Sequence, residues 1–241
     1  MSLSLKPHPR LMTDAERAAI HMQAAREKWG DCRRCPLHKR RTSHKLGKLP
    51  LMWGNGSPGA AVMVIDANTS WDELKTGQKY AGSVTGTMVQ IWNALGLVAM
   101  EDLFCTNLLK CPRVYDKVEG GYVDPDEGWV NTCKTALKRQ IEIVRPAVLI
   151  VQGKAANDAV LGDTRSSGEY MGHIRMYGKS CVALSTHSPF GFFGDRTSLK
   201  AEYFEHWKQA MYRLNMLGRI WRPEAAIFKR GWTLYDPSAA P

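Results

Sequence analysis

The 241-residue chain is predicted to fold as an α/β protein whose parallel sheet is covered by helices on both faces. Three observations predict this class. Short apolar stretches recur along the chain, as expected for strands that are buried on both faces. Segments with helical spacing alternate with these stretches, as in βαβ units. Polar side chains follow several of the strands, at the place where such sheets bind ligands.

The chain begins with a predicted helix and continues into a basic segment. The side chains of Thr13 and Asp14 can cap a helix that runs to about Trp29, and Gly30 marks its end. The basic segment covers residues 33–48 and is either a solvated loop or a loop that contacts phosphate groups. Four strand candidates come later, at residues 61–65, 103–109, 147–151 and 181–185.

Predicted helices separate the strand candidates and close the chain. A loop and helix are expected within residues 82–96, and helices are expected at 129–144 and 154–161. A long amphipathic helix is expected from about residue 202 to 217. These elements predict a three-layer α/β/α arrangement around a central four-stranded parallel sheet. We divide the chain into an N-terminal helix (1–30), a main α/β domain with a four-cysteine site (31–200), and a C-terminal helix with a basic and aromatic tail (201–241).

The charge of the chain favours a polyanionic partner. The 33 Lys and Arg residues outnumber the 23 Asp and Glu residues, which gives a net charge of +10. Each phosphate that such a surface neutralises releases counterions, so nucleic acid is a natural ligand, although charge alone does not separate DNA from RNA or a membrane. No apolar run approaches the ~18 residues that span a bilayer. The polar N-terminus lacks the apolar segment of a secretory signal, and we expect a cytosolic protein.

Four cysteines have the spacing of a metal site. In a reducing cytosol, cysteines are more often ligands, nucleophiles or core residues than disulfide partners. Cys32 and Cys35 form a CxxC pair, and Cys111 and Cys133 flank a loop that contains Pro and Gly. Spacing alone fits a [4Fe-4S] cluster and a tetrahedral zinc ion equally well, and buried free thiols remain an alternative for the second pair. The other two cysteines lie in strand patterns and are expected in the core.

Six sequence strings suggest a known family. They occur in the order CRRCPL (32–37), VMVIDANTS (62–70), KTGQKYAG (75–82), CTNLLKC (105–111), VRPAVLIVQGKAA (144–156) and THSP (186–189). Together they resemble the uracil-DNA glycosylase superfamily, most closely its iron-sulfur branch, family 4. The resemblance covers about two thirds of the chain. It implies the glycosylase fold, and it implies that the four cysteines bind a structural [4Fe-4S] cluster, with zinc as a minor alternative.

The catalytic strings depart from the family 4 pattern. Where the family has a GE-x-PG loop, this chain has the residues from Asp66 to Ser70, so the glycine, the acidic residue and the Pro-Gly pair are missing. Where the family has His-Pro-Ser, this chain has His187, Ser188 and Pro189. The loop between Cys111 and Cys133 is also longer than usual. These departures put the familiar loop geometry in question.

The resemblance assigns roles to individual residues. Tyr80 aligns with the aromatic residue that stacks on a flipped base, and Asn107 aligns with the amide that contacts the base edge. His187 is the candidate donor to the departing base. Asn68 ranks first for holding the attacking water, and Glu73 and Asp66 are the carboxylate candidates. The plainer alternatives are a hydrogen-bonded surface histidine, turn asparagines and a packed tyrosine.

Contacts with the rest of the DNA are expected from two segments. The basic segment offers phosphate contacts through Arg40, Arg41 and Lys45. Phe190 and Arg196 follow the histidine, and this stretch either inserts into the duplex as a wedge or forms a hydrophobic lid on the core.

The predicted function is that of a monofunctional DNA glycosylase acting as a monomer. It would flip a pyrimidine out of the duplex and hydrolyse its N-glycosidic bond, leaving an abasic site. The base would be uracil or a modified pyrimidine, 5-substituted or glycosylated, and the role either DNA repair or defence against phages with altered bases. The alternative is a catalytically inactive iron-sulfur protein of the same fold that binds or regulates DNA.

Overall fold

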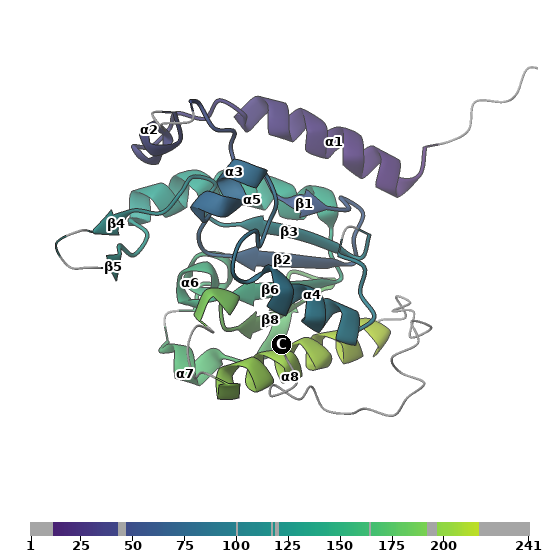
Figure 1. Ribbon diagram of the computed structural model, residues 1–241. Helices are drawn as coiled ribbons and strands as arrows, with labels where there is room; N and C mark the ends of the chain where they lie inside the picture. The colour runs from purple at the N-terminus through teal and green to yellow at the C-terminus, as the bar shows by residue number, and fades with distance from the viewer. Residues whose placement is uncertain are drawn as a thin grey trace, which may run out of the picture.

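A six-stranded sheet lies between two layers of helices in the computed structural model (Figure 1). The structure describes residues 12–216 except 43–46, 100, 117, 119–120, 164 and 192–196. The strand order is β1-β3-β2-β6-β8-β7. The four inner strands are parallel: β2 (Val62–Asp66), β3 (Leu103–Asn107), β6 (Val148–Gln152) and β8 (Cys181–Thr186). The antiparallel edges are β1 (Asn55–Gly56) and β7 (Ile174–Tyr177).

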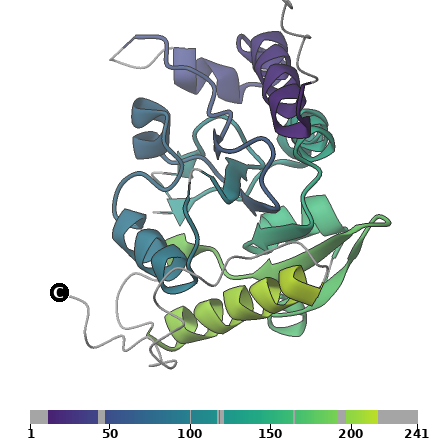
Figure 2. The ribbon, with the colours of Figure 1, turned by 90° about the vertical axis from the view of Figure 1, so that its right-hand side faces the viewer.

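Alternate residues of the inner strands pack on opposite helical layers. Met63 and Ile65 of β2 join one core cluster with α1 (Asp14–Trp29), α5 (Glu127–Val144) and α6 (Lys154–Leu161). Val62 and Val64 join a second cluster with α4 (Thr85–Ala94) and α8 (Thr197–Met216). Figures 1 and 2 show these two helical layers on either side of the sheet. The three-layer α/β/α prediction is confirmed.

The first helix forms as its sequence predicts. The Thr13 hydroxyl accepts from the Glu16 amide at 3.2 Å, and the Glu16 carboxylate accepts from the Thr13 amide at 2.7 Å. This reciprocal pair satisfies two amides that the first turn would otherwise leave free. Met22 and Trp29 lie on the buried face of α1, which packs against α5.

Shorter elements connect these layers and approach the carboxyl ends of the strands. They are α2 (Leu37–Thr42), α3 (Trp71–Thr76), α7 (Ser167–Tyr170), a 3₁₀ turn (Pro189–Gly191), and a hairpin of β4 (Tyr115–Asp116) and β5 (Gly121–Tyr122). The hairpin belongs to the long segment between Cys111 and Cys133 and projects from the side of the molecule (Figure 1).

The sequence predicted the four inner strands of the sheet but not its two edge strands. β1 has only two residues, and β7 is only partly buried, so neither produces the apolar run that marks an inner strand. Residues 217–241, with the basic and aromatic tail, lie outside the described residues, and the division into 1–30, 31–200 and 201–241 stays a prediction. Among the described residues, the helices are all too short or too polar to cross a membrane.

Candidate active site

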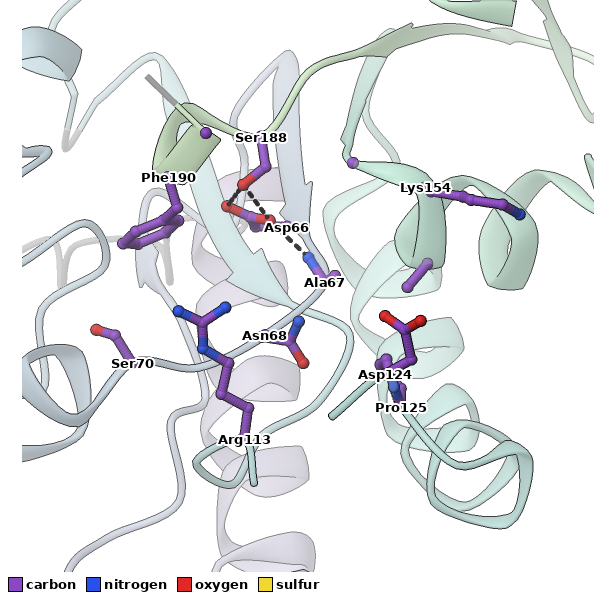
Figure 3. A pocket seen from close by; sticks show the side chains of 13 residues that line it. Asp66, Ala67, Asn68, Ser70, Arg113, Asp124, Pro125, Lys154, Ser188 and Phe190 are labelled. Carbon is purple, nitrogen blue, oxygen red and sulfur yellow. Dashed lines mark hydrogen bonds between the residues drawn. The ribbon is translucent and has the colours of Figure 1, made fainter. Parts of the chain in front are cut away.

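A cavity of about 300 Å³ lies at the carboxyl ends of the inner strands (Figure 3). Its wall comes from the segments that follow β2, β6 and β8, and from the insertion between the second pair of cysteines. The lining residues are Asp66, Ala67, Asn68, Ser70, Arg113, Asp124, Pro125, Gly153, Lys154, Ala155, Ser188, Phe190 and Gly191. The cavity therefore occupies the place where α/β sheets bind ligands.

Asp66 is the buried carboxyl group of this wall. Its side chain accepts from the Ala67 amide at 2.7 Å and from the Ser188 hydroxyl at 3.1 and 3.2 Å, as Figure 3 shows. Burial raises the pKa of Asp66, while the nearby Lys79 ammonium group acts in the opposite direction. The carboxyl group is thus held in one orientation, and its pKa depends on two opposing influences, burial and the Lys79 charge.

Asn68 also lines the cavity, as its predicted role requires. Its amide oxygen is buried and has no hydrogen-bond partner among the described residues. A buried acceptor without a partner is costly, so this oxygen is suited to a water molecule or a ligand donor.

Glu73 lies behind the cavity wall, where its contacts are structural. Its carboxylate accepts from the amides of Ser70 and Tyr80, each at 2.8 Å, and from the Lys79 ammonium group at 2.7 Å. The Ser70 hydroxyl accepts in turn from the Glu73 amide, which completes a capping box on α3. Glu73 does not line the cavity, so the suggested role in holding water has no support from its placement.

Asn107 is fully buried, and its neighbours fix the orientation of its amide group. Its Nδ2 donates to Thr69 Oγ1 at 3.0 Å and to Glu73 Oε2 at 3.3 Å. The Thr69 hydroxyl donates its own proton to the Leu109 carbonyl, so toward Asn107 it acts as an acceptor. Both neighbours therefore require the NH₂ group. The Asn107 oxygen is left without a partner among the described residues.

Tyr80 is buried beneath an aromatic neighbour. It adopts a positive φ of 63°, and its hydroxyl donates to Gln152 at 2.7 Å. The Phe190 ring is stacked on it, with centroids 6.5 Å apart and planes at 27°. Phe190 lines the cavity and Tyr80 does not, so the aromatic face exposed to the cavity is that of Phe190.

His187 faces α8. Its Nε2 lies 3.2 Å from a carboxylate oxygen of Glu202, and its ring stacks on His206 with centroids 5.9 Å apart. The Nε2–Glu202 contact is a close ion-pair distance without hydrogen-bond geometry. The residues that line the cavity include Ser188 but not His187. The histidine would have to leave Glu202 to act on a base.

The predicted DNA contacts are only partly supported. Arg41 is fully buried and donates to the carbonyls of Leu49 and Cys32, so the expectation that it binds phosphate is wrong. It closes the loop around the CxxC pair. Arg40 is half-buried, with its guanidinium group 5.9 Å from the centre of the Trp71 ring. Lys45 and Arg196 lie outside the described residues.

The four predicted cysteine ligands surround one small apolar cavity. Cys32, Cys35, Cys111 and Cys133 all line it, together with Trp29, Leu51 and Lys110. Burial raises the pKa of Cys111 to about 12 and raises the pKa of Cys35 and Cys133 as well. Within residues 12–216, outside the gaps, no three His, Cys, Asp or Glu side chains are arranged to hold a metal ion.

Lys110 separates this second cavity from the polar network. Its ammonium group donates to the Thr106 hydroxyl and the Asn107 carbonyl at 2.5 Å, and to Gln140 at 2.6 Å. Burial lowers the pKa of Lys110 to about 7. The side chain connects β3 to α5 and so helps to fix the strand end that carries Asn107.

Sequence reasoning did not assign roles to several residues of the site. Ser188 was noticed only as a departure from a motif, and Arg113, Asp124 and Lys154 come from segments without a catalytic pattern. Lys79 is the most consequential omission, because its side chain is only 2% exposed. Its place between Gln78 and Tyr80 is typical of a surface lysine. The sequence offered one signal for a role of Lys79: it lies in the string KTGQKYAG (75–82), which contributes to the family resemblance.

The comparisons with known proteins decide the family. The family model described as "Uracil DNA glycosylase superfamily" matches residues 53–211, which is more than half of the chain. This chain belongs to the uracil-DNA glycosylase superfamily. The class of enzyme is accordingly a DNA N-glycosylase, a hydrolase of N-glycosyl bonds.

Three relatives support the resemblance to family 4. Each is named type-4 uracil-DNA glycosylase. The protein of Saccharolobus solfataricus is 26% identical over 66% of this chain and 70% of its own length. That of Archaeoglobus fulgidus is 25% identical over 74% and 85%, and that of Thermotoga maritima is 25% identical over 56% and 63%. The predicted family is confirmed.

Proposed function

We propose that this glycosylase flips a pyrimidine out of DNA into the cavity beside Asp66 and hydrolyses its N-glycosidic bond, leaving an abasic site. The observation that supports this most strongly is the buried Asp66 carboxyl group, which Ser188 orients at the cavity wall. Asp66 is the last residue of the inner strand β2, at the sheet edge where α/β folds place their ligands.

The reaction requires an activated water and a stabilised leaving group. The departing base carries negative charge and the sugar positive charge, so a carboxylate near the sugar favours the reaction as a general base. We assign this role to Asp66, with the free oxygen of Asn68 as the acceptor that orients the water. His187 would supply the donor to the base after release from Glu202. Catalytic hydrogen bonds often form only in the substrate complex.

The fixed amide of Asn107 narrows the choice of base. Asn107 does not line the cavity, and both of its Nδ2 protons are engaged, so a base that reaches this side chain would meet only its oxygen. An acceptor suits the N3–H of uracil and also the 4-amino group of a cytosine-type base. We therefore propose a substrate range that includes uracil and 4-amino pyrimidines.

The cavity favours a modified pyrimidine within this range. Its volume of about 300 Å³ lies at the lower end of the ~300–1,000 Å³ typical of small-molecule sites. Arg113, Asp124 and Lys154 supply charged walls that suit a polar substituent, such as a hydroxymethyl group or a sugar. Excision of uracil would serve repair, and excision of a modified base would serve defence against phages.

We also propose that the four cysteines hold a [4Fe-4S] cluster with a structural role. Their common apolar cavity supports this, because it gathers the four thiols around one space and cysteine thiolates are the ligands of such clusters. Bound there, the cluster would join the CxxC segment to α5 and to the segment after β3.

One observation favours a second candidate, a DNA-binding protein without catalysis. His187 contacts Glu202 and not the cavity, and the family's acidic residue is replaced by Ala67. In that case the protein would bind modified DNA without releasing a base.

A matched set of duplexes tests these proposals. Each duplex carries one uracil, cytosine, 5-hydroxymethylcytosine or glycosylated cytosine at the same position, and alkali cleaves any abasic site. We expect cleavage at one or more of these bases by the wild type, and its loss with Asp66→Asn. Binding in a gel shift with no abasic product from any duplex would favour the second candidate.

A further inference from the structure

Lys79 places a positive charge inside the protein, directly behind the cavity wall. Its side chain is only 2% exposed, and its Nζ lies 2.7 Å from Glu73 Oε1 and 3.8 Å from Asp66 Oδ2. The same atom lies 3.6 Å from the centre of the Tyr80 ring and 5.4 Å from that of Phe190. The two rings and the two carboxylates fix the ammonium group in position.

Glu73 does not depend on Lys79 alone. Its carboxylate also accepts from the amides of Ser70 and Tyr80 and from the side chain of Asn107. These donors are part of the α3 cap and the strand end, and they contact the Glu73 carboxylate independently of Lys79. Burying an ammonium group costs free energy that a lysine at the surface does not incur. We therefore expect the buried Lys79 charge to serve a further contact.

Asp66 has fewer partners for its charge. It accepts from one amide and one hydroxyl, and Lys79 is the cation that contacts it from behind. Glu73 faces it from α3 with a like charge. Across the cavity, Arg113 and Asp124 from the insertion and Lys154 from α6 line the wall, while Tyr203 approaches from α8.

We propose that Lys79 is a positioning residue, whose ammonium group keeps the Asp66 carboxyl group ionised and held at the cavity wall. This inference rests on the proposed function, since an ionised Asp66 matters for catalysis only if it activates water. The Asp66 carboxylate takes a proton from the water as the oxygen attacks the sugar carbon, and the bond to the base breaks with its electron pair leaving on the base. Lys79 keeps its own proton throughout.

The sign of the expected pH effect follows from the charges. Burial raises the pKa of Asp66 and the Lys79 ammonium group is the largest opposing influence. Removal of the Lys79 charge should therefore raise that pKa further. The ionised form is the active base. As the pH is lowered, neutral variants of Lys79 should therefore lose activity at a higher pH than the wild type does.

The test compares Lys79→Met with Lys79→Arg and with a matched control. Lys79→Met removes the charge, and Lys79→Arg restores it. Lys79→Gln is a second neutral variant that retains a donor to Glu73 if the methionine variant does not fold. The control is Lys75→Met, which removes an exposed lysine of α3 that pairs with Asp72. Two quantities are measured: the pH profile of kcat/KM for abasic-site formation, and the Asp66 pKa from ¹³C-carboxyl NMR, assigned with Asp66→Asn.

We expect the neutral variants to move both the acid limb and the NMR midpoint upward by about 1–3 pH units. Lys79→Arg and Lys75→Met should stay within about 0.3 unit of the wild type. An unchanged Asp66 midpoint in a folded neutral variant would overturn the inference. If the wild type formed no abasic site in any duplex, the proposed function would fail, while the NMR comparison would still decide whether Lys79 controls the charge of Asp66.

Discussion

Asp66 is the residue on which the proposed chemistry depends. Replacement by Asn keeps the shape and the contact with Ser188 but removes the base. We expect kcat to fall by about 10²–10⁴-fold with little change in the stability of the fold, because general-base catalysis contributes factors of that size. Single-turnover rates of abasic-site formation measure the effect. Ser188→Ala, which removes one hydrogen bond to Asp66, should cost far less. Equal losses in both variants would argue against Asp66 as the base.

The pH dependence of the wild type offers a second residue-scale prediction. Burial raises the pKa of Asp66, so its ionised form disappears at a higher pH than for an ordinary aspartate. We expect kcat/KM to fall on the acid side with a midpoint above ~3.9, the usual aspartate value. The pH profile of the residual activity of Asp66→Asn should lack this acid-side midpoint. A profile that Asp66→Asn leaves unaltered would assign the acid limb to another group.

The sequence predicted where polar residues gather but not how each side chain points. Asp66 and Asn68 follow an apolar strand, so their place at the carboxyl edge follows from periodicity. The burial of Arg41 and Lys79 does not, because each depends on acceptors distant in sequence or on a folded loop, such as the Leu49 carbonyl for Arg41. The turn of His187 toward Glu202 likewise depends on how α8 packs.

At the scale of elements, the cap of α3 connects stability to the site. Ser70 caps this helix and Glu73 completes the capping box while holding Lys79 and Asn107. We expect Ser70→Ala to lower the free energy of unfolding by about 1 kcal/mol and also to lower kcat/KM. Thr13→Ala is the matched control, since it removes the same kind of cap from α1, away from the cavity. Chemical denaturation measures the stability of the two variants, and kinetics measures their activity. If both variants lost activity equally, the α3 capping box would have no specific effect on the site.

The elements themselves were largely predictable. The inner strands are buried on both faces and therefore appear as apolar runs, and α6 occupies the predicted residues 154–161. The cap marked the start of α1 because the predicted Thr13 side chain acts locally, while the partner role of Glu16 was not predicted. The edge strands β1 and β7 were missed since pairing with β3 and β8 determines them, and that pairing leaves no periodic pattern in so few exposed residues.

For the whole molecule, the four-cysteine cavity is expected to hold separate segments together. Cys133→Ser should abolish the broad visible absorption of an iron-sulfur protein and lower the melting temperature, because α5 would lose its link to the CxxC segment. Cys181→Ser is the control, since Cys181 lies in β8, outside that cavity. Iron analysis and visible spectra of the purified variants provide the measurement. If the purified wild type were colourless and contained zinc, the site would hold a single zinc ion and the cluster proposal would be wrong.

The identity of the base released from DNA tests the central claim most directly. Mass spectrometry of the small molecules released from the matched duplexes, by the wild type and by Asp66→Asn, detects a free base with its substituent still attached. We predict a free pyrimidine from the wild type, in amounts equal to the abasic sites, and a strongly reduced release from Asp66→Asn. Release of no base from any duplex, or equal release by both proteins, would contradict a hydrolytic site built around Asp66.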